Sequence, residues 1–221
     1  VVCHGCYDAP CQLKLGSWEG VARGTSKQPV YDAARLLEVP TTRLFVDAQL
    51  PSQWRQHGFS AVLNERTQTS QVNLAASVLY RSLALKRDHP LPASPLLSNA
   101  FDVSLERAST CPRIDQFDAF AQKSPLAGMP YGLPGLDERE FSTITRWIEA
   151  GAPFEGDEPL PVSVQQQVQV WEAFLNGDSN KERLMSRYLY EHLYLGTLYF
   201  EGDTGRQPLR LIRSAVAPGK P

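Results

Sequence analysis

Several common features are missing from this sequence of 221 residues, and each absence excludes a class of protein. No run of about 18 apolar residues occurs, so the sequence predicts no transmembrane helix. The 22 basic and 24 acidic residues nearly balance, which excludes a strongly basic nucleic-acid binder and an acidic disordered tail. Glycine-rich phosphate loops, G-x-S-x-G elbows and H-E-x-x-H motifs are also missing. We therefore expect no nucleic-acid partner and no nucleotide cofactor.

The residues that are present suit a globular protein with many ordered loops. Hydrophobic residues make up 42% of the chain, and its 17 prolines exceed the usual share. The proline-rich, acidic stretch 153–161 predicts a linker between a domain over 1–155 and a helical segment over 156–221. The sequence opens without an initiator methionine, so we expect an internal piece of a longer polypeptide, whose remaining domains would be its partners.

Cysteines cluster at the start of the chain: Cys3, Cys6 and Cys11 lie in VVCHGCYDAPCQLKL, and Cys111 stands alone. Four interpretations stay open. Cys3-His4 forms the second half of a C-x-x-C-H haem-attachment motif, in which cysteines bind the haem vinyl groups and the adjacent histidine binds iron. Cys3 and Cys6 form a C-x-x-C pair that suits redox chemistry or half a zinc site. The other two are a disulfide among Cys6, Cys11 and Cys111, and buried free thiols.

A second candidate iron ligand lies far along the chain, in the loop SPLAGMPYGLPGL. The sulfur of Met129 is the ligand that electron-transfer haem proteins often place opposite the histidine. Asp137 and Glu140 predict a capping box at the start of an amphipathic helix, which Gly151 ends. The alternative for Met129 is a core filler in a proline-rich loop, and Met185, in a later helical stretch, is a rival ligand.

Further helices are predicted from apolar spacing and capping residues. One helix is expected to run over residues 70–87. Beyond the linker, Asp178 or Ser179 is expected to cap the last helix. The aromatic-rich run 187–200 predicts a packed helix face, with a lipid-facing strip as the alternative. Within this run, His192 is expected to be a hydrogen-bonded core residue.

Two resemblances follow from these segments. The Met129 loop and the helix that ends in WIEAGAP resemble the closing half of a cytochrome c domain, in which the methionine is the sixth iron ligand. The chain as a whole resembles the bacterial fatty acid cis/trans isomerases, which are periplasmic haem c proteins that convert cis-unsaturated acyl chains of membrane phospholipids to trans. The matching segments are VVCHGCYDAPCQLKL, RGTSKQPVYD, LNER, CPRIDQFDAF, GMPYGLPGL, VWEAFLNGDS and MSRYLYEHLYL.

The second resemblance implies a fold, a cofactor and a set of site residues. The fold is mainly α, with a cytochrome c-like helical domain and a large loop-rich insertion over 1–155, followed by a helical segment over 156–221. The cofactor is a covalently bound haem c with iron. By this resemblance Cys3 carries a thioether, His4 is the proximal and catalytic ligand, and Met129 is inferred as the distal ligand. The implied location is the periplasm, and the implied substrate is the acyl chains of membrane phospholipids.

The implied chemistry needs no net redox change. A ferric haem that withdraws electron density from the double bond would let the bond rotate and then return the electron. A non-catalytic electron-transfer cytochrome domain of a larger enzyme is the alternative function, and an acyl-chain assay distinguishes the two. A haem-free binding module with a disulfide near its N-terminus is a third interpretation.

Overall fold

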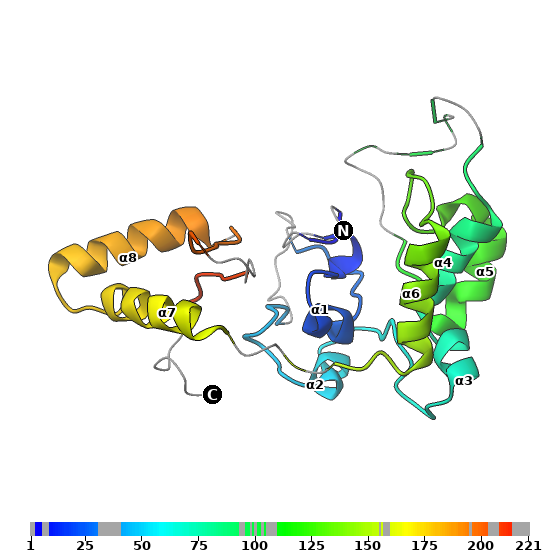
Figure 1. Ribbon diagram of the computed structural model, residues 1–221. Helices are drawn as coiled ribbons and strands as arrows, with labels where there is room; N and C mark the ends of the chain where they lie inside the picture. Colours follow the sequence, from blue (N-terminus) through cyan, green and yellow to red (C-terminus); the bar gives the residue numbers. More distant parts are fainter. Residues whose placement is uncertain are drawn as a thin grey trace. The chain divides into compact units, whose positions relative to one another are not determined.

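A computed structural model gives the fold of the chain, which is mainly helical and forms no β-sheet over the residues that it describes (Figure 1). These are residues 3–5, 9–30, 41–92, 96–97, 99, 101–102, 104, 110–154, 156, 160–194, 196–202 and 208–213. The prediction of a mainly α fold is confirmed. The chain separates into two compact units, Val1–Phe154 and Glu155–Pro221. None of the helices in the described ranges is long and apolar enough to cross a bilayer.

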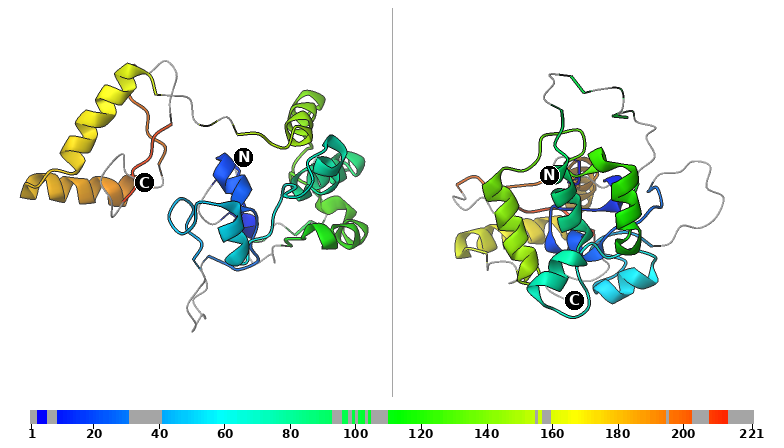
Figure 2. Two further views of the ribbon diagram at one scale, coloured as in Figure 1. Left: turned by 90° about the horizontal axis from the view of Figure 1, so that it is seen from below. Right: turned by 90° about the vertical axis from the view of Figure 1, so that its right-hand side faces the viewer.

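Short helices joined by long loops make up the first unit. The α-helices are α1 (Trp18–Arg23), α2 (Pro51–Gln56), α3 (Ser70–Ala75), α4 (Val78–Asp88), α5 (Phe117–Lys123) and α6 (Glu138–Glu149). The 3-10 turns are η1 (Pro10–Gln12), η2 (Ile114–Gln116) and η3 (Pro125–Ala127). Helix α4 lies between α5 and α6 (Figure 2, right). The loop that carries Met129 leaves η3 and returns to the chain at α6.

Helix α6 begins as the sequence predicts. The Glu140 backbone N–H donates to the Asp137 carboxylate at 2.7 Å, and the Asp137 N–H donates to the Glu140 side chain at 3.1 Å. These reciprocal bonds satisfy two N–H groups that have no partner inside a helix. The helix buries Phe141 and Ile148 one and a half to two turns apart on one face, and Gly151 follows its end with a φ of 88°.

The single helix predicted over 70–87 is wrong, because the structure has two helices there, α3 and α4. Ser77 interrupts the helical path. Its hydroxyl accepts a hydrogen bond from the Tyr80 N–H at 3.1 Å and donates to the Val62 carbonyl at 3.0 Å, and the residue is fully buried. A serine that caps a helix and binds a neighbouring segment favours a break over continued helix. The apolar spacing alone did not reveal this break.

Two apolar clusters hold the first unit together. The larger one joins Val21 of α1, Val62, Val78 and Leu85 of α4, and Phe117 of α5. Leu13, Leu15 and Trp147 pack against its edge. The smaller cluster joins Ala48, Trp54 and Phe59. The N-terminal segment and the helices around the Met129 loop therefore share one core.

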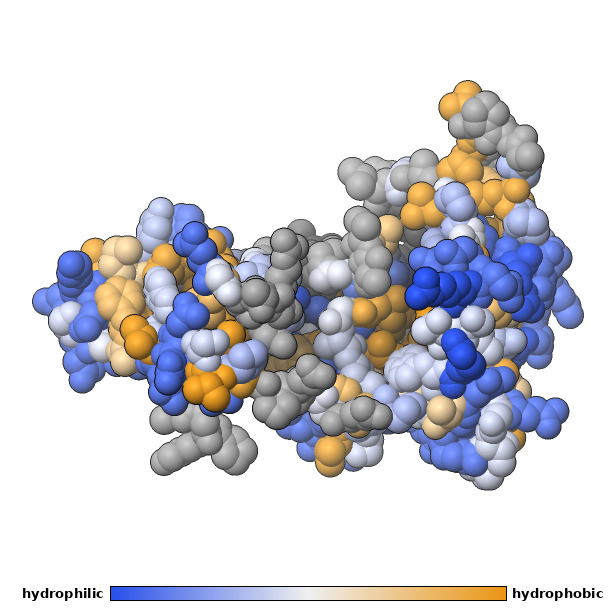
Figure 3. Space-filling view, in the orientation of Figure 1, coloured by the Kyte–Doolittle hydropathy of each residue, from blue (hydrophilic) through white to orange (hydrophobic). Residues whose placement is uncertain are grey.

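Two longer helices, α7 (Val162–Leu175) and α8 (Asn180–Leu193), form the second unit and pack on each other. Ser179 caps α8 and forms a capping box with Glu182, so the second of the two predicted caps is correct. Part of the predicted linker 153–161 lies outside the described residues. Val164 alone is buried among the described residues of α7 and α8. Figure 3 shows apolar side chains at the surface of this unit.

The aromatic run of the second unit does not form the packed face that its spacing predicts. Tyr188 is 53% exposed and Tyr199 is 55% exposed. His192 is exposed rather than part of a core, and its Nδ1 lies 2.8 Å from the Tyr188 carbonyl, one turn earlier on α8. Two helices that contact only each other have a single shared face, so most aromatic positions of α8 stay in solvent.

Candidate functional site

The imidazole of His4 is fixed from one side by the chain that follows it. Its Nδ1 lies 2.9 Å from the Leu13 carbonyl oxygen, and the Leu15 backbone N–H donates to the His4 carbonyl at 2.9 Å. A carbonyl can only accept, so Nδ1 carries the proton and Nε2 keeps its lone pair. This is the hydrogen-bond pattern that holds histidine ligands at metal centres. His4 is half-buried.

A tight reversal of the chain brings Leu13 beside His4. The reversal is η1, where Cys11 and Gln12 take left-handed backbone conformations with φ of 56° and 52°. Residues other than glycine adopt such angles rarely, and the surrounding contacts must hold them in place. Leu13 and Leu15 are anchored on the main apolar cluster. The position of the imidazole therefore depends on the core of the unit.

The cysteines of the segment have different roles. Cys11 forms a disulfide with Cys111, which lies just before η2. Cys3 is an exposed free thiol directly beside His4. Cys6 lies outside the described residues. The disulfide is one of the pairings that the sequence left open, and it removes Cys11 and Cys111 from the set of candidate cofactor ligands.

Arg23, at the end of α1, connects the His4 segment to the aromatic cluster around α2. Its buried guanidinium donates to the Gln12 carbonyl of η1 and, at 2.7 Å, to the Thr42 carbonyl. It also lies over the rings of Trp54 and Phe59, with its central carbon 5.7 and 5.2 Å from the ring centres. Sequence analysis missed this residue, because one arginine in a loop-rich stretch carries no local signal.

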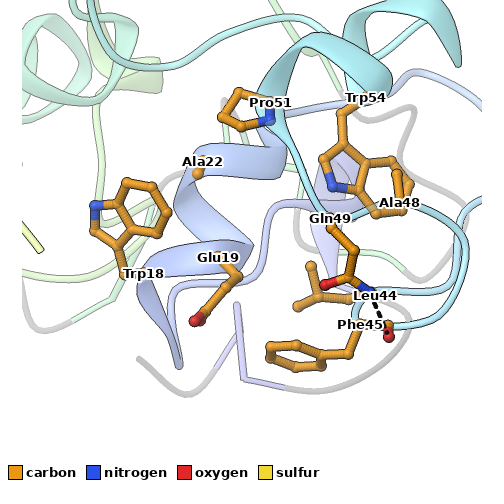
Figure 4. Close-up of a pocket in the computed structure, with 9 residues that line it drawn as sticks. All are labelled: Trp18, Glu19, Ala22, Leu44, Phe45, Ala48, Gln49, Pro51 and Trp54. Atoms are coloured by element: carbon orange, nitrogen blue, oxygen red, sulfur yellow. Dashed lines mark hydrogen bonds between the residues drawn. The ribbon is translucent and has the colours of Figure 1, made fainter. Parts of the chain in front are cut away.

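An apolar hollow lies between α1, the turn at 44–49 and α2 (Figure 4). It has an empty volume of about 290 Å³ that opens to solvent. Its lining residues are Trp18, Glu19, Ala22, Leu44, Phe45, Ala48, Gln49, Pro51 and Trp54. One carboxylate and one amide are its only charged or amide side chains, and the amide of Gln49 is engaged with the Phe45 carbonyl at 3.2 Å. The rest of the wall suits a hydrocarbon.

The turn that forms one wall of this hollow is held by an ion pair. The Asp47 carboxylate accepts hydrogen bonds from the Arg43 backbone N–H and from the Arg43 guanidinium, the latter at 2.8 Å. Burial raises the pKa of Asp47, but the hydrogen bonds and the charge of Arg43 outweigh it and hold the pKa below its ordinary value. The Asp47 carboxylate is therefore ionised at neutral pH and keeps the turn closed.

Met129 is half-buried and lies in a loop that follows α4 closely. Its backbone N–H donates to the Ser82 carbonyl at 2.9 Å, and the Met129–Pro130 peptide bond is cis. Leu85, one turn along α4, belongs to the same apolar cluster that anchors Leu13 beside His4. The two candidate iron ligands thus rest on one core. Met185, the rival ligand, lies on α8 in the other unit.

The described residues contain no cluster of three or more histidine, cysteine or acidic side chains that could hold a metal ion by themselves. A haem needs only axial ligands from the chain, because the porphyrin supplies the other four donors. An imidazole with a free Nε2, a neighbouring thiol and a half-buried thioether are the donor types that such a group requires. The residues present therefore fit a covalent haem.

Comparison with known proteins decides the family. The family model described as "Fatty acid cis/trans isomerase (CTI)" matches residues 39–221. The chain belongs to the fatty acid cis/trans isomerase family. The match includes α2, the Met129 loop and both helices of the second unit, whereas Cys3, His4 and α1 precede it. Searches of curated proteins and of solved structures each gave no match. Enzymes of this family are isomerases that act on fatty acids.

Proposed function

We propose that this member of the isomerase family converts cis-unsaturated acyl chains of membrane phospholipids to trans in the periplasm, and that it carries a covalent haem c. Cys3 would form the thioether, His4 would bind the iron through Nε2, and Met129 would be the opposite ligand. The observation that carries the proposal is the His4 imidazole, which is oriented by the Leu13 carbonyl next to a free thiol.

The chain itself contributes orientation at the iron. When bound, the haem supplies an electron-poor iron centre that can weaken a nearby double bond without net redox change. The Leu13 carbonyl keeps Nδ1 protonated, which directs the lone pair of Nε2 toward the metal and makes the imidazole a stronger donor. The bond from Leu15 to the His4 carbonyl fixes the backbone beneath it.

The hollow between α1 and α2 is the proposed contact for the acyl chain. It begins on α1, three residues after Leu15, so that the His4 segment and the hollow are joined by a short and well-anchored stretch. Trp18 and Trp54 give it wide apolar surfaces, and the exposed Phe45 stands at its rim. Burial of methylene groups in such a hollow stabilises binding by about 0.8 kcal/mol per group.

The decisive experiment replaces His4 in the full-length parent protein, matured with a haem-attachment system. His4→Ala is compared with His192→Ala, because His192 has the same contact from Nδ1 to a carbonyl but no neighbouring thiol. We expect His4→Ala to lose at least nine-tenths of the isomerisation of cis-acyl phospholipid vesicles, and His192→Ala to keep it. Cys3→Ala is expected to reduce covalent haem, measured by peroxidase staining of denaturing gels.

Three outcomes would contradict the proposal. Full isomerisation after His4→Ala would remove the imidazole from the mechanism. A matured parent protein without stained haem would remove the cofactor. Covalent haem without any isomerisation of vesicle lipid would favour an electron-transfer domain instead.

A further inference from the structure

Lys86 on α4 is the largest side chain that is fully buried, with 1% of its surface exposed. Its Nζ is buried and has no hydrogen-bond partner in the part of the chain that the structure describes. An ammonium group without a partner is costly to bury, because it loses its hydration and gains nothing in return. In agreement, burial lowers the pKa of Lys86. Such a group indicates a counter-ion that comes from outside the described chain.

The neighbouring cations of the same unit are all engaged. The Arg87 guanidinium lies 4.4 Å from the centre of the Phe141 ring, and Arg81 pairs with Asp118 and lies over Phe117. Arg55 pairs with Glu65 at 2.8 Å. Lys86 differs from them in being the most buried and in lacking an anion.

The Met129 loop covers Lys86. A side chain at Gly128 would overlap the backbone nitrogen of Lys86, so the loop touches α4 there. At the other end of the loop, a Cβ at Gly135 would lie 3.3 Å from Lys86 Cγ, with no other contact within 4 Å. Gly135 itself is exposed. The cover over the lysine is therefore thin at Gly135, and an anion can approach the amine from that side.

We propose that Lys86 binds a carboxylate at this loop, and that the carboxylate is a propionate of the haem. This inference rests on the proposed function. Met129, the candidate iron ligand, is carried by the same loop, so a haem bound by Met129 would bring its propionate edge to the loop that covers Lys86. An ammonium–carboxylate pair is strong where water is excluded, and it would keep Lys86 charged. A free fatty acid is the other source of a carboxylate.

The test uses the full-length haem-loaded parent and three variants. Lys86→Met removes the charge, Lys86→Arg keeps it but moves the donors, and Lys123→Met makes the same charge change at an exposed site on α5. The readouts are the haem reduction potential and the propionate bending mode in resonance Raman spectra. We expect Lys86→Met to lower the potential, because a nearby positive charge stabilises the reduced iron, and to shift the mode. Lys86→Arg should keep the potential and shift the mode, and Lys123→Met should change neither.

The inference fails if Lys86→Met binds covalent haem with the potential and propionate mode of the parent. It also fails if those haem signals are unchanged while the affinity for oleate drops, since Lys86 would then bind a free fatty acid. If Lys86→Met does not mature, Lys86→Arg decides: a shifted propionate mode supports the pair, and an unshifted mode overturns it. A parent without any covalent haem would overturn the proposed function, whereas a haem-loaded parent with unchanged variants would overturn only the role of Lys86.

Discussion

The two units of this chain are stabilised in different ways. In the first unit, long-range contacts dominate: a disulfide, the buried Arg23, the buried Ser77 and a core that draws on several short helices. In the second unit, two helices of 14 residues each have well-formed ends but bury little, and Leu184 and Val170 are 68% and 70% exposed. The comparison teaches that helix length is no guide to where the fold is fixed. The shorter helices carry the candidate site because they are held from several sides.

Removal of the disulfide should have the largest effect on this comparison. The double substitution Cys11→Ala and Cys111→Ala opens a covalent link across 100 residues. The unfolded chain gains entropy, and the expected loss of stability is roughly 4 kcal/mol. Thermal unfolding followed by circular dichroism measures it, with the reduced wild-type protein as a second route to the same state. A loss below 1 kcal/mol would show that the bridge constrains little.

Two N-cap serines give a matched comparison of the units. Ser77→Ala in the first unit removes a cap and also leaves the buried Val62 carbonyl without its donor, so we expect a cost of about 2–3 kcal/mol. Ser179→Ala in the second unit removes only an exposed cap, and should cost about 1 kcal/mol. Chemical denaturation of both variants tests the difference. Equal costs would contradict the claim that the first unit depends on buried polar contacts.

The smallest effect is expected from acid. In both units a carboxylate has a lowered pKa: Asp47 for the reason given above, and Glu182 because of hydrogen bonds from the Ser179 side chain and backbone. A lowered folded pKa stabilises the fold above the ordinary values of 3.8 and 4.5, and this stabilisation is lost as the pH falls through the folded pKa.

Asp47→Asn and Glu182→Gln should therefore flatten the fall in stability below about pH 4.5 and reduce stability modestly at pH 7. Asp47→Asn should have the larger effect, because only 4% of its side chain is exposed. Melting temperatures at pH 3 and pH 7 provide the measurement. An unchanged difference between the two pH values in both variants would show that neither carboxylate contributes.

Local signals in the sequence predicted much of the helical structure but little of its packing. The capping box at Asp137 and the cap at Ser179 were readable because both partners lie within four residues. The break at Ser77 was not, since it depends on Val62, a residue from another segment. The apolar spacing of α8 suggested burial, but burial needs a second surface, and α7 covers only one side.

The candidate site divides in the same manner. Cys3, His4 and Met129 stand out in the sequence because their types are rare and their chemistry is specific. The carbonyl of Leu13 that orients His4, the guanidinium of Arg23 and the buried amine of Lys86 have no local pattern. Their roles arise only when the chain reverses at η1 and when the Met129 loop returns to α4. Three-dimensional contacts were needed to find them.

The bridge from Cys11 to Cys111 also has a consequence for the connectivity of the chain. It closes a covalent ring that contains α1 to α4, while His4 and Met129 extend from opposite ends of this ring. A single cut by a protease anywhere inside the ring would leave the two pieces joined in a non-reducing gel. The histidine end would thus stay attached to the methionine end, even in a nicked molecule.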